Sequence, residues 1–293
     1  MTATNTARPT TTVGHVGLGA MGRPIAEFVA RAGFDTVAYD LSPDAGARGV
    51  RMVDGLAEVA TSDVVIVIVP TDDDVVGVVA GPGGLLEHGH RDMIVVISAS
   101  VRPETCRELA AKGARLGVHV IDAALTGGVR GAENGEINLL VGGPREVADR
   151  AGEVFGAFAK NYHVLGDVGA GQVAKSANNL IHWAQIVAID EALRMAQGLG
   201  VEPHALRRAL QEGPTDSRTL REMEQMRFTW YVKDIEIATS LAAATGHTLP
   251  VATLSRRLMD GVTVAAMHEL LAEPRESGEP GERGEEPGPG ESR

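Results

Sequence analysis

The chain has 293 residues, of which 44% are hydrophobic, 23% charged and 3% aromatic, and its formal net charge is −12. This hydrophobic content suffices for a large buried core, and the length predicts about two domains. A chain this acidic lacks the basic stripe that binds a phosphate backbone or an anionic membrane surface. Nucleic acid and membranes are therefore excluded as expected partners.

The chain also lacks the sequence features of secreted and membrane proteins. Its one cysteine, Cys106, cannot form an internal disulfide, and no apolar run approaches the roughly 20 residues that span a bilayer. The Thr-rich residues 1–12 contain no apolar segment of the kind found in a secretory signal. We therefore expect a cytoplasmic protein. Residues 1–12 and the Gly-, Pro- and Glu-rich residues 273–293 are predicted to be disordered.

Between residues 13 and 166, short β-branched segments alternate with amphipathic ones. Strands are predicted at Val13–Val16, Thr36–Tyr39, Val64–Val69, Ile94–Ser98, Val118–Asp122 and Asn138–Val141. Helices are predicted at Pro24–Ala32, Asp73–Val79, Pro103–Leu116 and Glu146–Phe158. Runs that are apolar throughout, such as VVIVIV, are typical of strands buried on both faces of a parallel sheet. The alternation predicts a doubly wound α/β domain.

From residue 167 to residue 272 the pattern is helical. One long helix is predicted from Gly169 to about Gly198, and further helical stretches continue to about Leu271 without strand alternation. Gly198 and Gly200 suit a helix C-terminus, and Pro203 suits the start of the next helix. We expect an all-helical second domain that follows the first through a long interdomain helix.

The segment GLGAMG lies between the first predicted strand and the first predicted helix. Its first glycine allows a tight turn, its second lets the backbone approach a pyrophosphate, and its third permits close packing of the helix. The N–H groups of the helix start would face the phosphates. The spacing predicts a dinucleotide-binding loop of Rossmann type, although a glycine-rich turn of another α/β protein is the alternative. The expected contacts are Gly17, Leu18, Gly19, Ala20, Met21 and Gly22.

Asp40 follows the glycine loop by 18 residues, at the end of the second predicted strand. Its carboxylate would accept the ribose hydroxyls of NAD and repel the 2′-phosphate of NADP. Arg48 lies nearby in the sequence and could soften this preference. NAD is therefore the expected cofactor, and NADP is kept as an alternative.

Two more loops follow predicted strands at the edge where parallel sheets bind ligands. Val69 and Pro70 are expected beside the dinucleotide, and Thr71 or Asp72 is expected to cap the next helix. The acidic run at residues 72–74 has no nearby His or Cys, so no metal site is expected there. Ser100 falls in the equivalent loop after the next strand, from which it could reach the nicotinamide.

Thr126, Gly127 and Gly128 follow the fifth predicted strand, in the segment DAALTGG. A hydroxyl followed by two glycines exposes consecutive backbone N–H groups beside a side-chain donor. This arrangement suits an anion such as a carboxylate. A flexible turn is equally compatible with these three residues.

The segment GAGQVAKSANN carries Lys175 and Asn179, which are four residues apart and share one face of a helix. The helix continues as LIHWAQIVAI, which is apolar nearly all round, and a lysine on a buried helix is costly unless it is used. Beside an oxidised nicotinamide the pKa of Lys175 should fall, so that it could exchange a proton with a substrate hydroxyl. A lysine that extends to solvent at a helix end is the alternative.

Taken together and in order, these motifs resemble those of the β-hydroxyacid dehydrogenase family, which includes the 3-hydroxyisobutyrate dehydrogenases. GLGAMG, DAALTGG and GxGxxxKxxxN are followed by KDIEIA at residues 233–238 and by Leu249–Pro250, so that the resemblance covers residues 13 to 265. It implies hydride transfer between a nicotinamide cofactor and a small, anionic 3-hydroxy acid or its semialdehyde. It also implies a homodimer or a homotetramer.

The resemblance implies a role for each matching residue. Lys175 would be the catalytic acid or base, and Asn179 would bind and orient the substrate. Lys233 would close over substrate and cofactor, and Ser100 would lie against the nicotinamide. The residues that would hold the substrate carboxylate are Thr126, Gly127 and Gly128.

The chain departs from the family pattern in places that concern the substrate. Ala124 and Thr126 replace the usual Pro and Ser, and His182 stands where aliphatic residues are commoner and is expected to be packed. An imine reductase typically has Asp or Tyr in place of Lys175, and a 6-phosphogluconate dehydrogenase has a longer helical domain. A dinucleotide-binding scaffold without activity is a further alternative, although the retention of Lys175, Asn179 and Lys233 argues against it.

Overall fold

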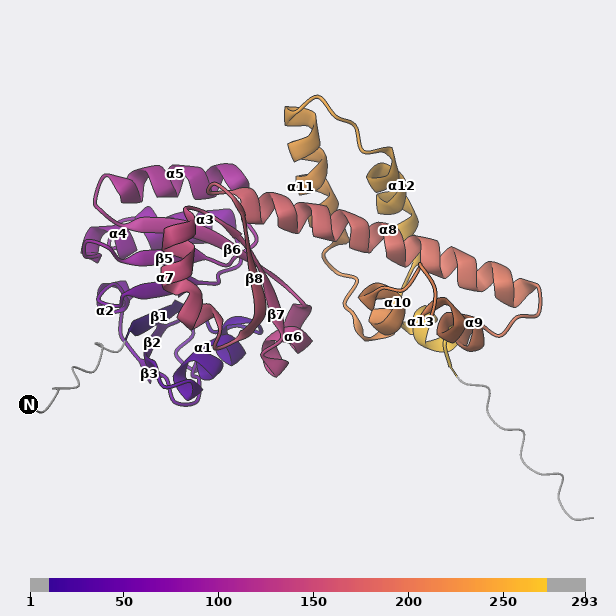
Figure 1. Ribbon diagram of the computed structural model, residues 1–293, viewed down its shortest axis with the longest axis horizontal. Coiled ribbons are helices and arrows are strands. Elements are labelled where there is room, and N and C mark those ends of the chain that lie inside the picture. Colours follow the sequence, from indigo (N-terminus) through magenta and orange to yellow (C-terminus); the bar gives the residue numbers. More distant parts are fainter. Residues whose placement is uncertain (1–10, 273–293) are drawn as a thin grey trace, which may run out of the picture. The chain divides into compact units, whose positions relative to one another are not determined.

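The computed structural model describes residues 11–272, shown in Figure 1. The segments predicted to be disordered lie outside the described residues, apart from residues 11 and 12. Thr12 is not disordered: it begins the first strand, and its backbone N–H and its hydroxyl both donate to Asp63 Oδ2 at 2.8 Å.

The described chain forms two compact units. The first contains residues 11–181 and 231–253, and the second contains residues 182–230 and 254–272. The long helix α8 (Ala170–Gly198) contributes to both units. The predicted boundary after residue 166 follows the change from strands to helices, and it stays a prediction.

The first unit is built on an eight-stranded sheet in the order β3-β2-β1-β4-β5-β6-β7-β8. The strands are β1 (Thr12–Val16), β2 (Asp35–Tyr39), β3 (Arg51–Met52), β4 (Val64–Val67), β5 (Ile94–Ile97), β6 (His119–Thr126), β7 (Ile137–Gly142) and β8 (Ala159–Gly166). The strands from β3 to β6 pair in parallel. Strand β7 is antiparallel to β6, and β8 is parallel to β7.

Helices cover both faces of this sheet, as the doubly wound prediction requires (Figure 1). They are α1 (Gly22–Arg31), α2 (Leu56–Val59), α3 (Asp72–Ala80), α4 (Leu85–His88), α5 (Pro103–Ala114), α6 (Gly128–Asn134) and α7 (Arg145–Phe155). On one face Ile25 of α1 and Phe155 of α7 are buried against the strands, and on the other face Val79 of α3 and Leu109 of α5 are buried. The unit also includes α11 (Tyr231–Ala244).

The second unit is helical: within the described residues no strand follows Gly166. Besides part of α8 it contains α9 (Pro203–Leu210), α10 (Arg218–Glu222), η1 (Met223–Gln225), η2 (Met259–Gly261), α13 (Val264–Leu270) and most of α12 (Pro250–Leu258). Its core includes Trp183, whose ring meets Phe228 edge-on at 6.5 Å. His182 packs as expected, with Nδ1 2.9 Å from the hydroxyl of Thr219. Among residues 11–272 no helix is long and apolar enough to cross a membrane.

Candidate active site

The glycine loop between β1 and α1 has the shape that the motif predicts. Gly17 adopts a left-handed conformation with φ of 92°, and a Cβ there would overlap the carbonyl oxygen of Ile68. A Cβ at Gly22 would overlap the carbonyl oxygen of Gly17. Around Gly19, by contrast, a Cβ would meet no atom of the described residues within 4 Å, chain neighbours aside. The protein's own packing thus requires the outer two glycines, whereas the middle one leaves room for an outside group.

The start of α1 completes this cradle. Within the described residues, no side chain caps the helix N-terminus at Met21, and the first turn carries no acidic residue. Uncapped N–H groups at a helix start favour an anion such as a pyrophosphate. The loop and helix start therefore fit a dinucleotide.

Asp40 lies directly against this loop. Its Oδ2 accepts a hydrogen bond from the backbone N–H of Leu18 at 2.6 Å, and its Oδ1 accepts one from Ser42 at 2.8 Å. The two bonds hold the carboxylate at the carboxyl end of β2, beside the glycine loop. Arg48 is exposed, and its backbone N–H donates to Glu27.

The loop after β4 begins α3. Thr71 is the N-cap: its hydroxyl accepts from the backbone N–H of Asp74 at 3.1 Å, and the carboxylate of Asp74 accepts from the N–H of Thr71 at 3.1 Å. Asp72 instead accepts from the backbone N–H of Arg102 at 3.0 Å and so ties α3 to the start of α5. Pro70 is exposed and Val69 is half-buried in this loop.

The loop after β5 is tied to α8 by one buried side chain. Gln172, which is only 2% exposed, donates from Nε2 to the carbonyl oxygen of Ala99 at 2.8 Å. Its Oε1 accepts from the backbone N–H of Val101 at 3.3 Å. The two bonds bracket Ser100, which therefore lies at the start of α8.

Asp122 of β6 holds the N-terminus of α8. Its Oδ1 accepts from the backbone N–H of Gly169 at 2.5 Å, and its Oδ2 accepts from that of Gln172 at 2.9 Å. The side chain is fully buried, and burial raises its pKa to about 6 although these hydrogen bonds act to lower it. A Cβ at Gly171 would overlap the carbonyl oxygen of Leu140, so the helix start fits closely against the sheet.

Three predicted site residues meet in one small cavity of the first unit. Ser100, Lys175 and Asn179 line it together with Val101, Gln172, Ser176, Asp234 and Ile237. Burial lowers the pKa of Lys175 below its ordinary value, and the negative charge of Asp234 acts in the opposite direction. A lysine in this setting gives up its proton more readily than one in water. The arrangement can therefore exchange a proton with a group in the cavity.

The structure does not bring every predicted residue to this cavity. Its lining, within the described chain, does not include Lys233, which is exposed on α11, or Thr126, Gly127 and Gly128. The hydroxyl of Thr126 donates to the carbonyl oxygen of Asn138 at 3.0 Å and accepts from the amide of that residue at 3.2 Å. Both glycines adopt left-handed conformations, with φ of 114° and 65°, and begin α6.

Three residues of the site were not predicted from the sequence: Asp122, Gln172 and Asp234. An acidic residue within an apolar strand indicates that its carboxylate has a specific hydrogen-bond partner, and Asp122 is such a residue. Asp234 stands beside Lys233 in the KDIEIA segment. The role of Gln172 depends on contacts with a loop more than 70 residues away and has no local signal.

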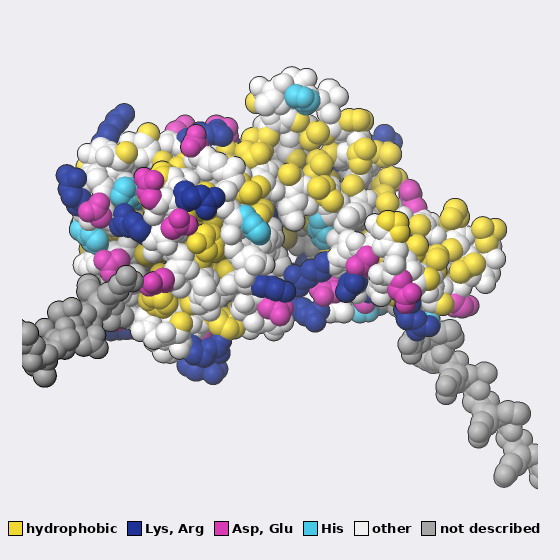
Figure 2. Space-filling view, viewed as in Figure 1, with side chains coloured by type: hydrophobic (Ala, Val, Ile, Leu, Met, Phe, Trp, Pro, Cys, Tyr) yellow, Lys and Arg dark blue, Asp and Glu magenta, His cyan; other side chains and the backbone are white. Residues whose placement is uncertain are grey.

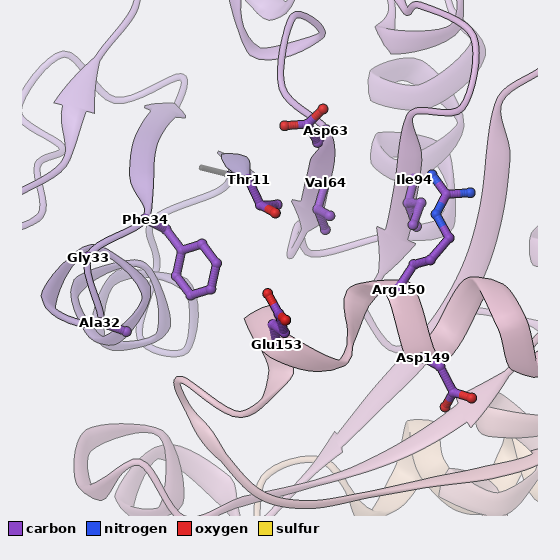
Figure 3. A pocket seen from close by; sticks show the side chains of 10 residues that line it. All are labelled: Thr11, Ala32, Gly33, Phe34, Asp63, Val64, Ile94, Asp149, Arg150 and Glu153. Carbon is purple, nitrogen blue, oxygen red and sulfur yellow. The ribbon is translucent and has the colours of Figure 1, made fainter. Parts of the chain in front are cut away.

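A larger cavity of about 630 Å³ lies at the opposite edge of the sheet (Figure 3). It is lined by residues at the amino ends of strands, including Val64 and Ile94, and by Glu153 of α7. In Figure 3 the ring of Phe34 and the carboxylate of Glu153 point toward the same space. Ligands of open parallel sheets bind at the carboxyl ends of the strands, so this cavity is separate from the candidate active site.

Comparisons with known proteins cover both parts of the chain. Residues 12–166 match the family model for the NAD-binding domain of 6-phosphogluconate dehydrogenase. Residues 169–271 match the model for the NAD-binding domain of NADP-dependent 3-hydroxyisobutyrate dehydrogenase. The chain is 31% identical over 254 residues to 2-hydroxy-3-oxopropionate reductase of Escherichia coli (strain K12), covering 81% of this chain and 86% of that protein.

Two further relatives are 3-hydroxyisobutyrate dehydrogenases. The chain is 32% identical over 205 residues to the mitochondrial protein of Bos taurus, which covers 68% of this chain but only 61% of the bovine protein. The solved structure of the Mycobacterium tuberculosis protein with L-serine superimposes with a TM-score of 0.77 and 26% identity, covering 90% of this chain and all of that one.

Proposed function

Because the chain belongs to the β-hydroxyacid dehydrogenase family and has its NAD(P)-binding domain, we propose that it transfers a hydride between a nicotinamide cofactor and a small 3-hydroxy acid or its semialdehyde. The observation that carries this proposal is the position of Lys175. It lies with Asn179 and Ser100 in one cavity, and burial lowers its pKa. Burial of an amine lowers the stability of the fold, and a protein that only binds a dinucleotide would not need a lysine at this position.

The cofactor would be held by the glycine loop and by the start of α1. The backbone around Gly19 would receive the pyrophosphate, and Val69 and Pro70 would lie alongside the dinucleotide. We propose that Asp40 favours NAD over NADP, because its fixed carboxylate can accept the ribose hydroxyls and would repel a 2′-phosphate. The hydride chemistry is that of the bound nicotinamide.

The residues of this chain supply proton transfer and orientation. In the oxidative direction, neutral Lys175 takes the proton of the substrate hydroxyl onto Nζ as the carbinol becomes a carbonyl, and in the reductive direction it returns that proton. Asn179 hydrogen-bonds and orients the substrate on the same helix face. The family resemblance also assigns the substrate carboxylate to Thr126, Gly127 and Gly128 and the closing role to Lys233, although within the described chain none of these four lines the cavity of Lys175.

We also propose that the protein is a cytoplasmic homodimer or homotetramer. An exposed apolar stripe supports assembly: Val251, Leu254 and Leu258 follow one another at helical spacing on α12 and are 62%, 54% and 36% exposed. In Figure 2 exposed hydrophobic side chains gather over α12. The buried, unpaired thiol of Cys106 is compatible with a reducing compartment.

One experiment tests the proposed reaction directly. The purified protein is incubated with NAD or NADP and with 3-hydroxyisobutyrate, glycerate, serine or 3-hydroxypropionate, and reduced cofactor is followed by its absorbance. We expect at least one of these acids to be oxidised, with NAD as the better cofactor. If none is oxidised and none of the matching semialdehydes is reduced, the proposal fails.

A further inference from the structure

Gln172 joins two parts of the candidate site that are far apart in the sequence. Its side-chain amide binds both sides of Ser100, through the carbonyl oxygen of Ala99 and the N–H of Val101. Because Gln172 is 2% exposed, water does not compete for these two bonds. The loop after β5 is therefore fixed to one point on α8.

That point on α8 is itself fixed to the sheet. The backbone N–H of Gln172 donates to the buried carboxylate of Asp122 at 2.9 Å, and its carbonyl oxygen accepts from the hydroxyl of Ser176 at 3.1 Å. Backbone and side chain of one residue thus connect α8, strand β6 and the loop after β5. Lys175 stands three residues further along the helix, about 4.5 Å along its axis.

An amide of this length suits the position. It offers one donor and one acceptor at neighbouring atoms, which match a carbonyl oxygen and an N–H two residues apart. A glutamate ion has the same shape but no donor for Ala99, a leucine has neither group, and an asparagine is one methylene shorter.

We propose that Gln172 is a positioning residue, whose side chain sets the distance between the loop that carries Ser100 and the proton-transfer group of Lys175. This inference rests on the proposed function, in which that loop lies against the nicotinamide. Loss of the tie lets the loop move relative to Lys175, so hydride and proton transfer are no longer aligned. A displacement of about 1 Å in such a site slows the reaction up to a hundredfold.

The test compares Gln172→Leu and Gln172→Glu with Val173→Ala, a control on the same helix whose side chain is 44% exposed. Active sites are counted by NADH titration, so that kcat refers to folded protein only. We expect kcat per site to fall about tenfold to a hundredfold in both Gln172 variants, with the KM for NAD within about threefold. The isotope effect on kcat with a substrate deuterated at the carbinol carbon should rise, since hydride transfer becomes rate-limiting. Unchanged kcat per site would overturn the proposal.

A second measurement does not depend on turnover. Amide hydrogen exchange at Val101, whose N–H donates to the Gln172 side chain, should be faster in Gln172→Leu than in the unmodified protein and in Val173→Ala. Unchanged exchange at Val101 would overturn the tie itself. If the unmodified protein oxidises no substrate, the proposed function fails even when the exchange result is as expected, so the two failures are distinguishable.

Discussion

Lys175 of α8 and Asp234 of α11 line the same cavity, and the negative charge of Asp234 opposes the effect of burial on the lysine. Burial favours the neutral amine and lowers its pKa, whereas the nearby carboxylate favours the ammonium ion and raises it. Burial and the charge of Asp234 together therefore set the pH at which Lys175 can accept a proton.

Replacement of Asp234 with Asn should move the pH profile of hydroxyacid oxidation. Without the negative charge the pKa of Lys175 falls further, and the neutral base is present at lower pH. The acidic limb of the kcat/KM profile should therefore shift to lower pH. Glu236→Gln, an exposed change on the same helix, is the control and should leave the limb in place. A limb that stays fixed or moves to higher pH in Asp234→Asn contradicts this assignment.

The buried carboxylate of Asp122 should leave a pH-dependent mark on stability. Its pKa is 3.8 in water and about 6 in the fold. Between these values the folded protein keeps a proton that the unfolded chain has lost, so the group's contribution to stability falls as the pH rises. By pH 7 the buried carboxylate is ionised, and the loss of folding stability reaches its full size, on the order of 3 kcal/mol.

In Asp122→Asn the side chain at this position no longer titrates. The variant also loses one acceptor for the backbone N–H groups at the start of α8, which changes its free energy of unfolding by an amount that does not depend on pH. The stability of the variant relative to the unmodified protein should therefore increase from pH 4 to pH 7. Urea unfolding of both proteins at each pH unit measures this difference. A difference that is constant with pH is inconsistent with a raised pKa for Asp122.

Two alanine substitutions in the glycine loop should affect different properties, one the affinity for NADH and the other the stability of the fold. At Gly19 a Cβ would meet no atom of the described residues within 4 Å, chain neighbours aside, so Gly19→Ala should leave thermal stability unchanged. The same variant should bind NADH about tenfold or more weakly, because the methyl group would occupy the space of the pyrophosphate. At Gly22 a Cβ overlaps the Gly17 carbonyl, so Gly22→Ala should cost about 1–3 kcal/mol of stability. Full NADH affinity in Gly19→Ala would show that the cofactor does not approach this residue.

Substitution of Asp40 should change the cofactor preference. Asp40→Asn keeps an acceptor for the N–H of Leu18 but removes the charge that repels a 2′-phosphate. We expect the ratio of kcat/KM for NADP to that for NAD to rise at least about tenfold. Asp44→Asn, an exposed change in the following loop, should leave the ratio unaltered. A preference for NADP in the unmodified protein would refute the role given to Asp40.

The elements that sequence predicted well are those with a strong apolar pattern. Strands β4 and β5 are buried at every position, and their continuous runs of Val and Ile predict them from the sequence. Strand β8 was missed because it is an edge strand, half-buried or exposed along its whole length, and so carries no hydrophobic period. Helix α6 was missed because its sequence, GVRGAEN, contains two glycines, which disfavour a helix in isolation.

The site was only partly predictable for a related reason. The glycine loop and the Lys175–Asn179 pair are local patterns, visible within a few residues. The contacts of Asp122 with α8 and of Gln172 with the Ser100 loop join residues 47 to 73 positions apart, and no local period encodes them. The antiparallel β7 also depends on the turn that α6 makes after the left-handed Gly127, a tertiary feature.

Proton transfer by Lys175 can be tested by measuring the turnover and the NADH affinity of Lys175→Ala, with Lys112→Ala on the exposed face of α5 as the control. We expect kcat to fall at least about a hundredfold in Lys175→Ala, because the general base is lost. The dissociation constant for NADH should stay within about threefold in both variants, since the glycine loop and Asp40 are intact. An unchanged kcat in Lys175→Ala would show that Lys175 is not the group that exchanges the proton.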